Sequence, residues 1–374
     1  MRSLLISLLA LAVLAPAARA DYVIEGRGFG HGVGMSQYGA YGYALRESRD
    51  VQFILSHYYT GSSYGTAPGA RMRVRLKKQR APRISGATLA RAATGRRIRL
   101  AEAHVYRFKA LDATRIQIIN TFNGKTKARV RAPVTVTGGA STTLRGTAEN
   151  GLANGSYRSR LVLSRDGSGV LVVNNVGLEQ YLYGVVPSEM PASWPAEALK
   201  AQAVVARSYA LKSRRPTAAY DVFADVRSQV YRGVLAETSA SNAAVNATRA
   251  RVVTVGGEIA QTFFFSTSGG RTATNEEAFG GSPISYLRSV DDPYDDLSPY
   301  HTWEATFTAS QARKRLKPIT NGTFRGLEVA TRTGSGRAAT MTVHGSRGDT
   351  TASAAQVRTL LELRSTWITK VTGP

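Results

Sequence analysis

The sequence of 374 residues contains no cysteine, only five histidines and few acidic residues. The absence of cysteine excludes disulfide bonds and any zinc or redox site that needs a thiolate. A chain of this length must then be stabilised by an apolar core, in one large domain or two smaller ones. Asp and Glu number 25 against 49 Lys and Arg, which gives a formal net charge of +24. This excess predicts an anionic partner: nucleic acid, anionic lipid or an acidic wall polymer.

Hydrophobic runs of membrane-spanning length are also missing. Residues 1–20 combine a basic start, an apolar stretch over Leu4–Leu14 and small residues up to Ala20, the order typical of a signal peptide. The apolar stretch is too short to span a bilayer comfortably, so we expect cleavage after Ala20. The protein is then exported and is periplasmic, cell-wall-associated or secreted. Export favours a lipid or wall partner over nucleic acid, although the charge alone is also compatible with a solvated basic surface.

The pattern of residues predicts an α+β fold. Residues 21–65 suggest a strand, a glycine-rich loop over Gly26–Gly34 and two short helices between Tyr38 and Tyr59. Short β-branched runs from Ala70 to Leu171, separated by Gly, Pro and Asn, predict a β-rich domain that carries much of the positive charge.

Helices return after this β-rich region. We expect helices at Pro195–Arg215, Ala236–Arg249 and Ala354–Leu361, and strands at Arg251–Val255 and Glu258–Phe265. Lys200 and Arg207 stand two turns, or about 10 Å, apart on one side of the first of these helices. A pair of cations in register can bracket a charged polymer.

Glu189 is the candidate for acid–base chemistry. It lies between Pro187 and Pro191, just before Trp194 and the start of the long helix. Apolar neighbours such as Met190, Pro191 and Trp194 would desolvate the carboxyl group, raise its pKa and keep it protonated as a general acid near neutral pH. The alternative is an ordinary loop glutamate that caps a helix.

The sequence shows no second carboxylate that is as well placed as Glu189. Ordinary glycosidases need two carboxyl groups flanking the scissile bond. Lytic cleavage of peptidoglycan needs one, because the C6 hydroxyl of the substrate attacks the anomeric carbon and a single carboxyl group can give and then take the proton. A lone glutamate therefore suits a lytic transglycosylase better than a hydrolase.

Other polar residues are weaker candidates. His31, among glycines, could ligate a metal or hydrogen-bond a sugar, although a lone histidine in a turn is more often structural. The acidic cluster Asp291, Asp292, Asp295 and Asp296 could bind a cation, but the prolines around it favour a solvated turn. The glycine loop lacks the helix and acidic residue that a dinucleotide-binding motif requires.

Two long motifs resemble the stage II sporulation protein D family, SpoIID/LytB. The first is NVGLEQYLYGVVPSEMPASWPAEALKAQAVVARSYA at Asn175–Ala210, and the second is GFGHGVGMSQYGA at Gly28–Ala40. Shorter matches lie at Ser266–Gly270, Gln229–Gly233 and Arg364–Trp367. The resemblance thus covers the front motif and most of the chain after about Tyr157.

The resemblance implies a SpoIID-like catalytic domain of mixed sheet and helix, and an activity. The family includes lytic transglycosylases that cleave glycan strands already stripped of stem peptides and leave 1,6-anhydro-muramic acid ends. Its catalytic glutamate corresponds to Glu189. The expected substrate-binding residues are His31, Ser36, Gln37, Lys200, Arg207 and Ser268. Stripped strands expose a lactyl carboxylate on each muramic acid, a physical partner for the basic surface.

The order of the motifs departs from the family arrangement. The His-Gly-Val-Gly-Met-Ser-Gln motif normally follows the Ser-Thr-Trp segment, whereas here it lies near the N-terminus, as in a circular permutation. The strand around Trp367–Val371 should then lie beside Tyr22–Glu25 and bring His31, Ser36 and Gln37 towards Glu189. We accordingly expect a signal peptide at 1–20, a first part of the SpoIID-like domain at 21–65, a β-rich insert at 66–156 and the main domain at 157–374.

Metal and partners complete the expectations. Some family members hold zinc through cysteines, and the corresponding places here are Phe223 and Ser228, so no metal and no cofactor are expected. An alternative to the enzyme is a non-catalytic wall-binding protein that enhances an amidase, with an N-acetylmuramoyl-L-alanine amidase as a further candidate partner. Nucleic-acid binding is not expected, because no basic motif with interleaved aromatic residues is present.

Overall fold

The computed structural model describes residues 21–373, so the expected signal peptide at 1–20 lies outside the described residues. The fold is mixed α+β, as expected, with 25% helix and 37% strand. Contacts divide the chain into a smaller unit, residues 21–27 with 302–373, and a larger unit, residues 28–301. Each unit has its own apolar core. The expected boundaries near residues 65 and 156 fall inside the larger unit and stay a prediction.

The smaller unit joins the two ends of the described chain. Strand β1 (Tyr22–Arg27) lies between β18 (Thr302–Phe307) and β22 (Ile368–Thr372), antiparallel to both. Val23 stands opposite Thr372, so the expected neighbourhood of the N-terminal and C-terminal strands is present. A second sheet and two helices complete this unit: β19 (Phe324–Arg332), β20 (Ala338–Gly345), β21 (Thr350–Ser353), α7 (Ala309–Leu316) and α8 (Ala354–Leu361).

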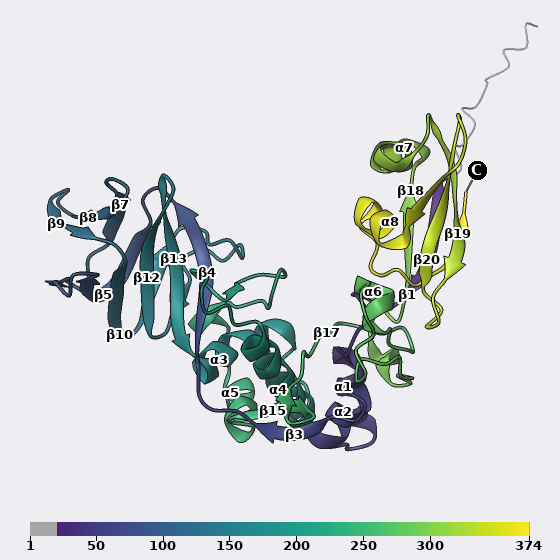
Figure 1. The fold of residues 1–374 in the computed structure, drawn as a ribbon, viewed down its shortest axis with the longest axis horizontal. Coiled ribbons are helices and arrows are strands. Elements are labelled where there is room, and N and C mark those ends of the chain that lie inside the picture. The colour runs from purple at the N-terminus through teal and green to yellow at the C-terminus, as the bar shows by residue number, and fades with distance from the viewer. Residues whose placement is uncertain (1–20, 374) are drawn as a thin grey trace, which may run out of the picture. The chain divides into compact units, whose positions relative to one another are not determined.

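The β-rich region expected between Ala70 and Leu171 is confirmed as one large sheet of the larger unit (Figure 1). On β4, Met72, Val74 and Leu76 are fully buried and alternate with arginines that point to the other face. The strands lie in the order β14-β4-β13-β12-β10-β5-β7-β8-β9, with β6 beside β5 and β11 beside β10. Their bounds are β4 Arg71–Gln79, β5 Arg83–Ala92, β6 Arg97–Arg99, β7 Tyr106–Ala110, β8 Arg115–Asn120, β9 Thr126–Arg131, β10 Val134–Arg145, β11 Ser156–Tyr157, β12 Arg160–Asp166, β13 Gly169–Gly177 and β14 Val222–Phe223.

Of the helices of the larger unit, α3, α4 and α5 lie at one end of this sheet (Figure 1). Helix α4 packs closely on its neighbours because Ala203, Ala206 and Ala210 are completely buried. It begins one residue after Pro195, which caps it instead of occupying its first turn, and ends at Lys212. The helices are α1 Gln37–Arg46, α2 Val51–Tyr58, α3 Leu178–Glu189, α4 Ala196–Lys212, α5 Ser239–Ala247 and α6 Asn275–Phe279. No helix of residues 21–373 is long and apolar enough to cross a membrane.

Two expected elements are shorter than the sequence indicated. Helix α5 starts at Ser239 because Thr238 caps it, and Gly233–Ala236 forms a separate 3-10 turn. The strand expected at Glu258–Phe265 is split into β16 (Glu258–Ile259) and β17 (Phe264–Phe265). Strands β16 and β3 (Ser63–Thr66) flank β15 (Arg251–Val255), whereas β17 pairs in parallel with β2 (Met35–Ser36). The split therefore brings the phenylalanines around residue 264 to the glycine-rich loop.

Gly39, in the first turn of α1, allows this helix to pack closely against Tyr58 of α2 and against Asp292. A Cβ atom added there would lie 1.9 Å from Tyr58 Oη and 2.2 Å from Asp292 Oδ1, both buried. We expect Gly39→Ala to lower the free energy of unfolding by several kcal/mol, about 3 or more, because neither group can move without breaking its hydrogen bond to the other. Gly69→Ala is the control, since a Cβ there meets nothing within 4 Å. Equal urea midpoints for the two variants would contradict this account.

Candidate active site

Glu189 is the last residue of α3, and its side chain leaves the helix towards a neighbouring loop. Its Oε1 atom accepts a hydrogen bond of 2.6 Å from the backbone N–H of Val230. That loop is fixed in turn by Gln229, whose side chain bonds Tyr181 of α3 and the carbonyl oxygen of Ala206 of α4. The glutamate expected in a rigid loop is therefore held at a helix end by a fixed backbone donor.

A pocket of about 280 Å³ opens beside this carboxyl group. Its apolar lining raises the pKa of Glu189 to about 7, mainly because the carboxyl group is desolvated, while the Val230 N–H and Arg232 act in the opposite direction. Among the described lining residues, Glu189 is the only carboxylate. The lining consists of His31, Glu189, Tyr209, Val226, Ser228, Val230, Phe263, Phe264 and Phe279.

The residues expected to desolvate Glu189 are not those that line the pocket. Met190 belongs to the core, and Trp194 stacks on Tyr41 with 4.5 Å between ring centroids. The apolar wall is made by Tyr209 and by the phenylalanines at 263, 264 and 279, which the sequence analysis missed. The sequence signal for Phe263 and Phe264 is the run of three phenylalanines directly before the Ser266–Gly270 motif, and no such signal marks Phe279.

His31 lies in this wall, and both of its ring nitrogens are hydrogen-bonded. Nδ1 accepts from the backbone N–H of Val33 at 3.0 Å, so Nε2 carries the proton and donates to the carbonyl oxygen of Phe264 at 3.1 Å. The ring lies 5.1 Å from that of Phe279. This arrangement favours a neutral histidine that shapes the pocket, and it leaves neither nitrogen for a metal without breaking these bonds.

Gln37 contacts Glu189 through the main chain. Its Nε2 atom donates to the carbonyl oxygen of Glu189 at 3.0 Å and to Gln202 Oε1 at 3.3 Å. Ser36 precedes it as the N-cap of α1 and accepts from the N–H of Gly39 at 3.1 Å. Of the expected site residues, the structure thus brings Glu189, His31 and Gln37 together, with Ser36 orienting the helix that carries Gln37.

Ser268 belongs to a buried polar cluster. Its hydroxyl donates to Asp295 Oδ2 at 2.8 Å, and Asp295 Oδ1 lies 2.8 Å from His301 Nδ1. Asp292 and Asp295 are fully buried, so the expectation of a solvated turn is wrong for both. Desolvation and the charge of Asp295 raise the pKa of Asp292 to about 7. The hydrogen bonds to Ser268 and Tyr58 tie this cluster to the Ser266–Gly270 loop and to α2.

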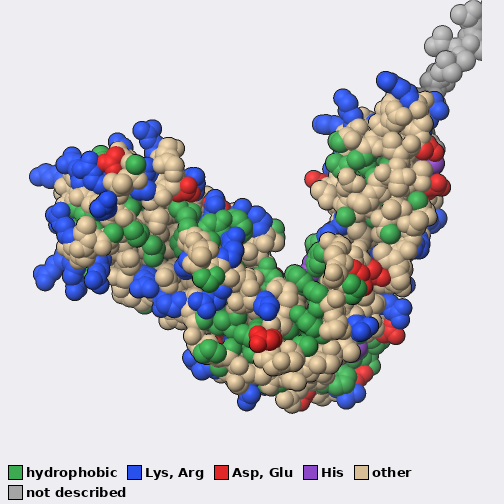
Figure 2. Space-filling model, viewed as in Figure 1, with side chains coloured by type: hydrophobic (Ala, Val, Ile, Leu, Met, Phe, Trp, Pro, Cys, Tyr) green, Lys and Arg blue, Asp and Glu red, His purple; other side chains and the backbone are tan. Residues whose placement is uncertain are grey.

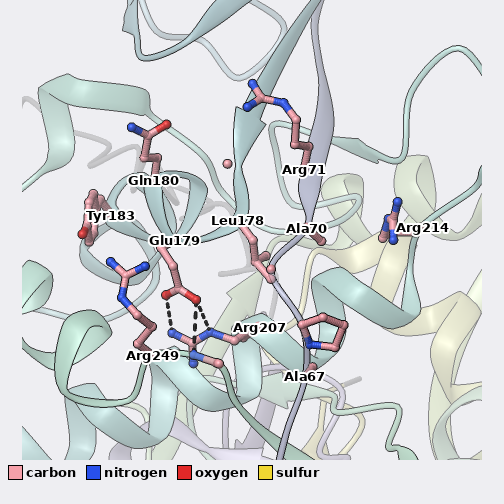
Figure 3. Close-up of a pocket in the computed structure, with 14 residues that line it drawn as sticks. Ala67, Ala70, Arg71, Leu178, Glu179, Gln180, Tyr183, Arg207, Arg214 and Arg249 are labelled. Carbon is pink, nitrogen blue, oxygen red and sulfur yellow. Dashed lines mark hydrogen bonds and ion pairs between the residues drawn. The ribbon is translucent and has the colours of Figure 1, made fainter.

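Lys200 and Arg207 are both paired with glutamates. Lys200 Nζ lies 2.6 Å from Glu197 Oε1, and the Arg207 guanidinium contacts Glu179 at 3.0 and 2.7 Å (Figure 3). Arg207 is completely buried and also donates to the carbonyl oxygen of Arg251. The expected pair of cations bracketing a polymer is therefore not formed by Arg207, because its charge is already neutralised inside the protein, and we do not carry it into the proposed site.

Phe223 and Ser228, the places considered for zinc ligands from the resemblance, bond to each other and to a neighbouring arginine. The backbone N–H of Phe223 donates to Ser228 Oγ at 3.2 Å, and the ring of Phe223 lies under Arg227 at 3.8 Å. A hydrogen bond and a cation–π contact thus join the ends of this loop. Within residues 21–373, no group of three or more His, Cys, Asp or Glu side chains could hold a metal ion.

The raised pKa of Glu189 predicts a pH dependence of stability. Between the unfolded value of 4.5 and the folded value of about 7, the folded protein holds a proton that the unfolded chain has lost. The contribution of Glu189 to the free energy of unfolding is therefore most favourable below pH 4.5, and it falls as the pH rises towards 7. We expect Glu189→Gln to raise the melting temperature at pH 8 and to leave it nearly unchanged at pH 4. The same shift at both pH values would contradict a raised pKa.

Comparison with known proteins places this site within a family. The family model described as SpoIID, stage II sporulation protein, matches residues 166–255, which include α3, α4 and Glu189. Stage II sporulation protein D of Bacillus subtilis is 34% identical over 190 residues, which cover 46% of this chain and 55% of that protein. The protein of the same name from Bacillus amyloliquefaciens is 32% identical over 192 residues, covering 47% and 56%.

An amidase enhancer of Bacillus subtilis is 35% identical over 139 residues, covering 37% of this chain and 18% of that protein. The chain spans about half the length of the stage II sporulation proteins that it matches. The permuted order of the motifs stays an interpretation. The family model and these relatives agree on the segment that carries Glu189, and residues 166–255 match the stage II sporulation protein D (SpoIID) family.

Proposed function

We propose that the protein is a peptidoglycan lytic transglycosylase that cleaves stripped glycan strands with Glu189 as acid and then base. The observation that carries this proposal is the single carboxylate of the described pocket, with a pKa of about 7. A group with this pKa is partly protonated near neutral pH and can both give and take a proton. A two-carboxylate hydrolysis has no second group in this lining.

The proposed reaction moves one proton and consumes no water. Glu189 donates its proton to the glycosidic oxygen, and the bond between that oxygen and C1 of muramic acid breaks. The resulting carboxylate then takes the proton of the C6 hydroxyl while O6 bonds to C1, which closes the 1,6-anhydro ring and regenerates the acid. The apolar wall of Phe263, Phe264 and Phe279 supports this route because its side chains offer no hydrogen-bonding group that would hold an attacking water.

The positions of the remaining residues support roles in shaping the site. His31 holds the wall through its bond to the Phe264 carbonyl, and Gln37 fixes the main chain of Glu189. We propose both as positioning residues. Export to the cell envelope, where the substrate is found, is part of the same proposal.

A second candidate function is enhancement of an amidase without catalysis. The similarity to an amidase enhancer favours it. Incubating the purified protein with peptide-free glycan strands, in the absence of any amidase, distinguishes the two. Release of fragments with 1,6-anhydro-muramic acid ends, identified by mass spectrometry, is expected of the enzyme. Intact strands under conditions where binding is measurable would reject the enzyme and favour the enhancer.

A further inference from the structure

A large basic hollow lies at the opposite end of α3 from Glu189 (Figure 3). Its volume is about 890 Å³, and Arg71, Arg214 and Arg249 reach it from β4 and from the segments that follow α4 and α5. The acid in its lining, Glu179, is already bound by the buried Arg207. Helix α3 has 12 residues, so the hollow lies about 16 Å from Glu189 and is a separate place.

Apart from Arg207, the arginines around this hollow form no ion pair within the described residues. Arg214 and Arg249 are exposed and form no ion pair with any residue that the structure describes. Arg71 donates to Asn175, and burial together with the charge of Arg160 lowers the pKa of Arg71, as expected for a cation without a neighbouring anion. By contrast, Arg73 and Arg75 on the same strand are paired with acids.

A second hollow, of about 460 Å³, lies on the outer face of the large sheet between β5, β10 and β12. Arg91 stands opposite Thr135, and Arg160 stands opposite Thr137, so two cations and two hydroxyl groups face this space. Both arginines are exposed and have no partner within residues 21–373. Its described lining contains no carboxylate.

Asn175 connects one arginine of each hollow. Arg160 stands directly opposite Asn175 across β12 and β13, and the Arg71 side chain binds the same asparagine. The result is a continuous path of arginines, here named the basic track, formed by Arg214, Arg249, Arg71, Arg160 and Arg91. Figure 2 shows Lys and Arg side chains gathered over this part of the larger unit, with few Asp and Glu between them. Residues 70–171 hold 22 Lys and Arg against 4 Asp and Glu.

We propose that the basic track binds a linear glycan that carries a carboxylate on its repeating unit, as a second site separate from the Glu189 pocket. Two successive hollows joined by cations fit a chain of sugar units better than one compact anion. Guanidinium groups bind carboxylates in a bidentate manner, and Thr135, Thr137 and Gln180 offer hydrogen bonds to sugar hydroxyls. Tyr183 is the only aromatic residue of the described linings, which argues against stacked nucleic-acid bases.

The choice of a glycan as the ligand rests on the proposed function, whereas binding to the basic track does not require catalysis by Glu189. The test therefore uses full-length protein with Glu189→Gln, which is expected not to cut the ligand. Labelled peptide-free glycan strands are titrated with this protein and with two further variants of it, Arg91→Gln/Arg160→Gln and Arg214→Gln/Arg249→Gln. Each pair should weaken binding about ten-fold or more, because each removes two charge-assisted contacts.

The matched control is Lys127→Gln/Arg129→Gln on β9, the strand at the far end of the same sheet. This pair is also exposed and lacks acidic partners within the described chain, and its loss should change affinity less than about two-fold. Equal weakening by the control, or unchanged binding by both track variants, would overturn the proposal. Unchanged melting temperatures are expected throughout, since these side chains have no described partner to lose.

Two further probes test the nature of the ligand. Chito-oligosaccharide, a glycan of similar backbone without the carboxylate, should bind at least about ten-fold more weakly than the stripped strands. Inorganic polyphosphate is the second probe. If it binds as tightly as the stripped strands and is weakened equally by the track substitutions, the arginines recognise negative charge alone, and the glycan assignment is overturned. The same arginine substitutions made in the protein that keeps Glu189 should leave the cleavage of short fragments unchanged, so failure of the track and failure of the catalytic proposal give different results.

Discussion

Glu189→Gln is expected to reduce the rate of glycan cleavage by about 10² to 10⁴, the usual contribution of a general acid–base group. The substitution keeps an oxygen that can accept the hydrogen bond from Val230, so the pocket should keep its shape. The variant should therefore still bind stripped strands. Kinetics of fragment release under saturating substrate, together with a binding titration, measure the two effects separately.

Glu258→Gln is the control for this experiment. Glu258 is exposed on the short strand β16 and has no described partner, so its substitution should leave the rate unchanged. The pH dependence adds a second readout, because the acid must be protonated at the start of the reaction. The rate should fall as the pH rises above about 7, following the raised pKa of Glu189. A Glu189→Gln variant that retains a tenth or more of the activity would contradict a catalytic role.

Glu179→Gln is expected to destabilise the protein by about 3 to 5 kcal/mol, because it leaves the fully buried guanidinium of Arg207 without its counter-ion. Arg207 packs α3 and α4 against the start of β15, so the loss should appear as a lower urea midpoint. The remaining carbonyl partners, of Val245 and Arg251, accept hydrogen bonds but cannot neutralise the charge.

The control for the buried pair is Glu237→Gln, which breaks a similar ion pair with the more exposed Arg158. That change should cost about 1 kcal/mol or less, since solvent screens the arginine that remains. A Glu179→Gln variant that is as stable as wild type but binds stripped strands poorly would contradict this interpretation. It would restore the expectation that Arg207 holds substrate.

Periodicity was a good guide to the elements with strong local signals. The helix at Ala354–Leu361 has the predicted bounds, because Ser353 and Gln356 form a capping box. Two short helices follow the glycine loop as predicted, and the second begins where Asp50 caps it. The short β-branched runs likewise predicted the β-rich region, in which β4 buries every second side chain.

Contacts that depend on distant segments could not be predicted in this way. The pairing of β17 with β2 brings Phe263 and Phe264 to Glu189, yet nothing local distinguishes these phenylalanines from core residues. Helical spacing correctly placed Lys200 and Arg207 on one helix. It did not reveal that Glu179, 28 positions away, forms an ion pair with Arg207. The Asp292 cluster was misjudged because the prolines around it indicated a turn and not its burial.

The source of the oxygen at the new chain end tests the central claim most directly. Stripped glycan strands are digested by the wild-type protein in water enriched in ¹⁸O, and the fragments are analysed by mass spectrometry. Attack by the C6 hydroxyl, with Glu189 as the only carboxyl group, predicts anhydro ends that contain no ¹⁸O. Incorporation of ¹⁸O into new reducing ends would show that water attacks and would contradict the single-carboxylate mechanism.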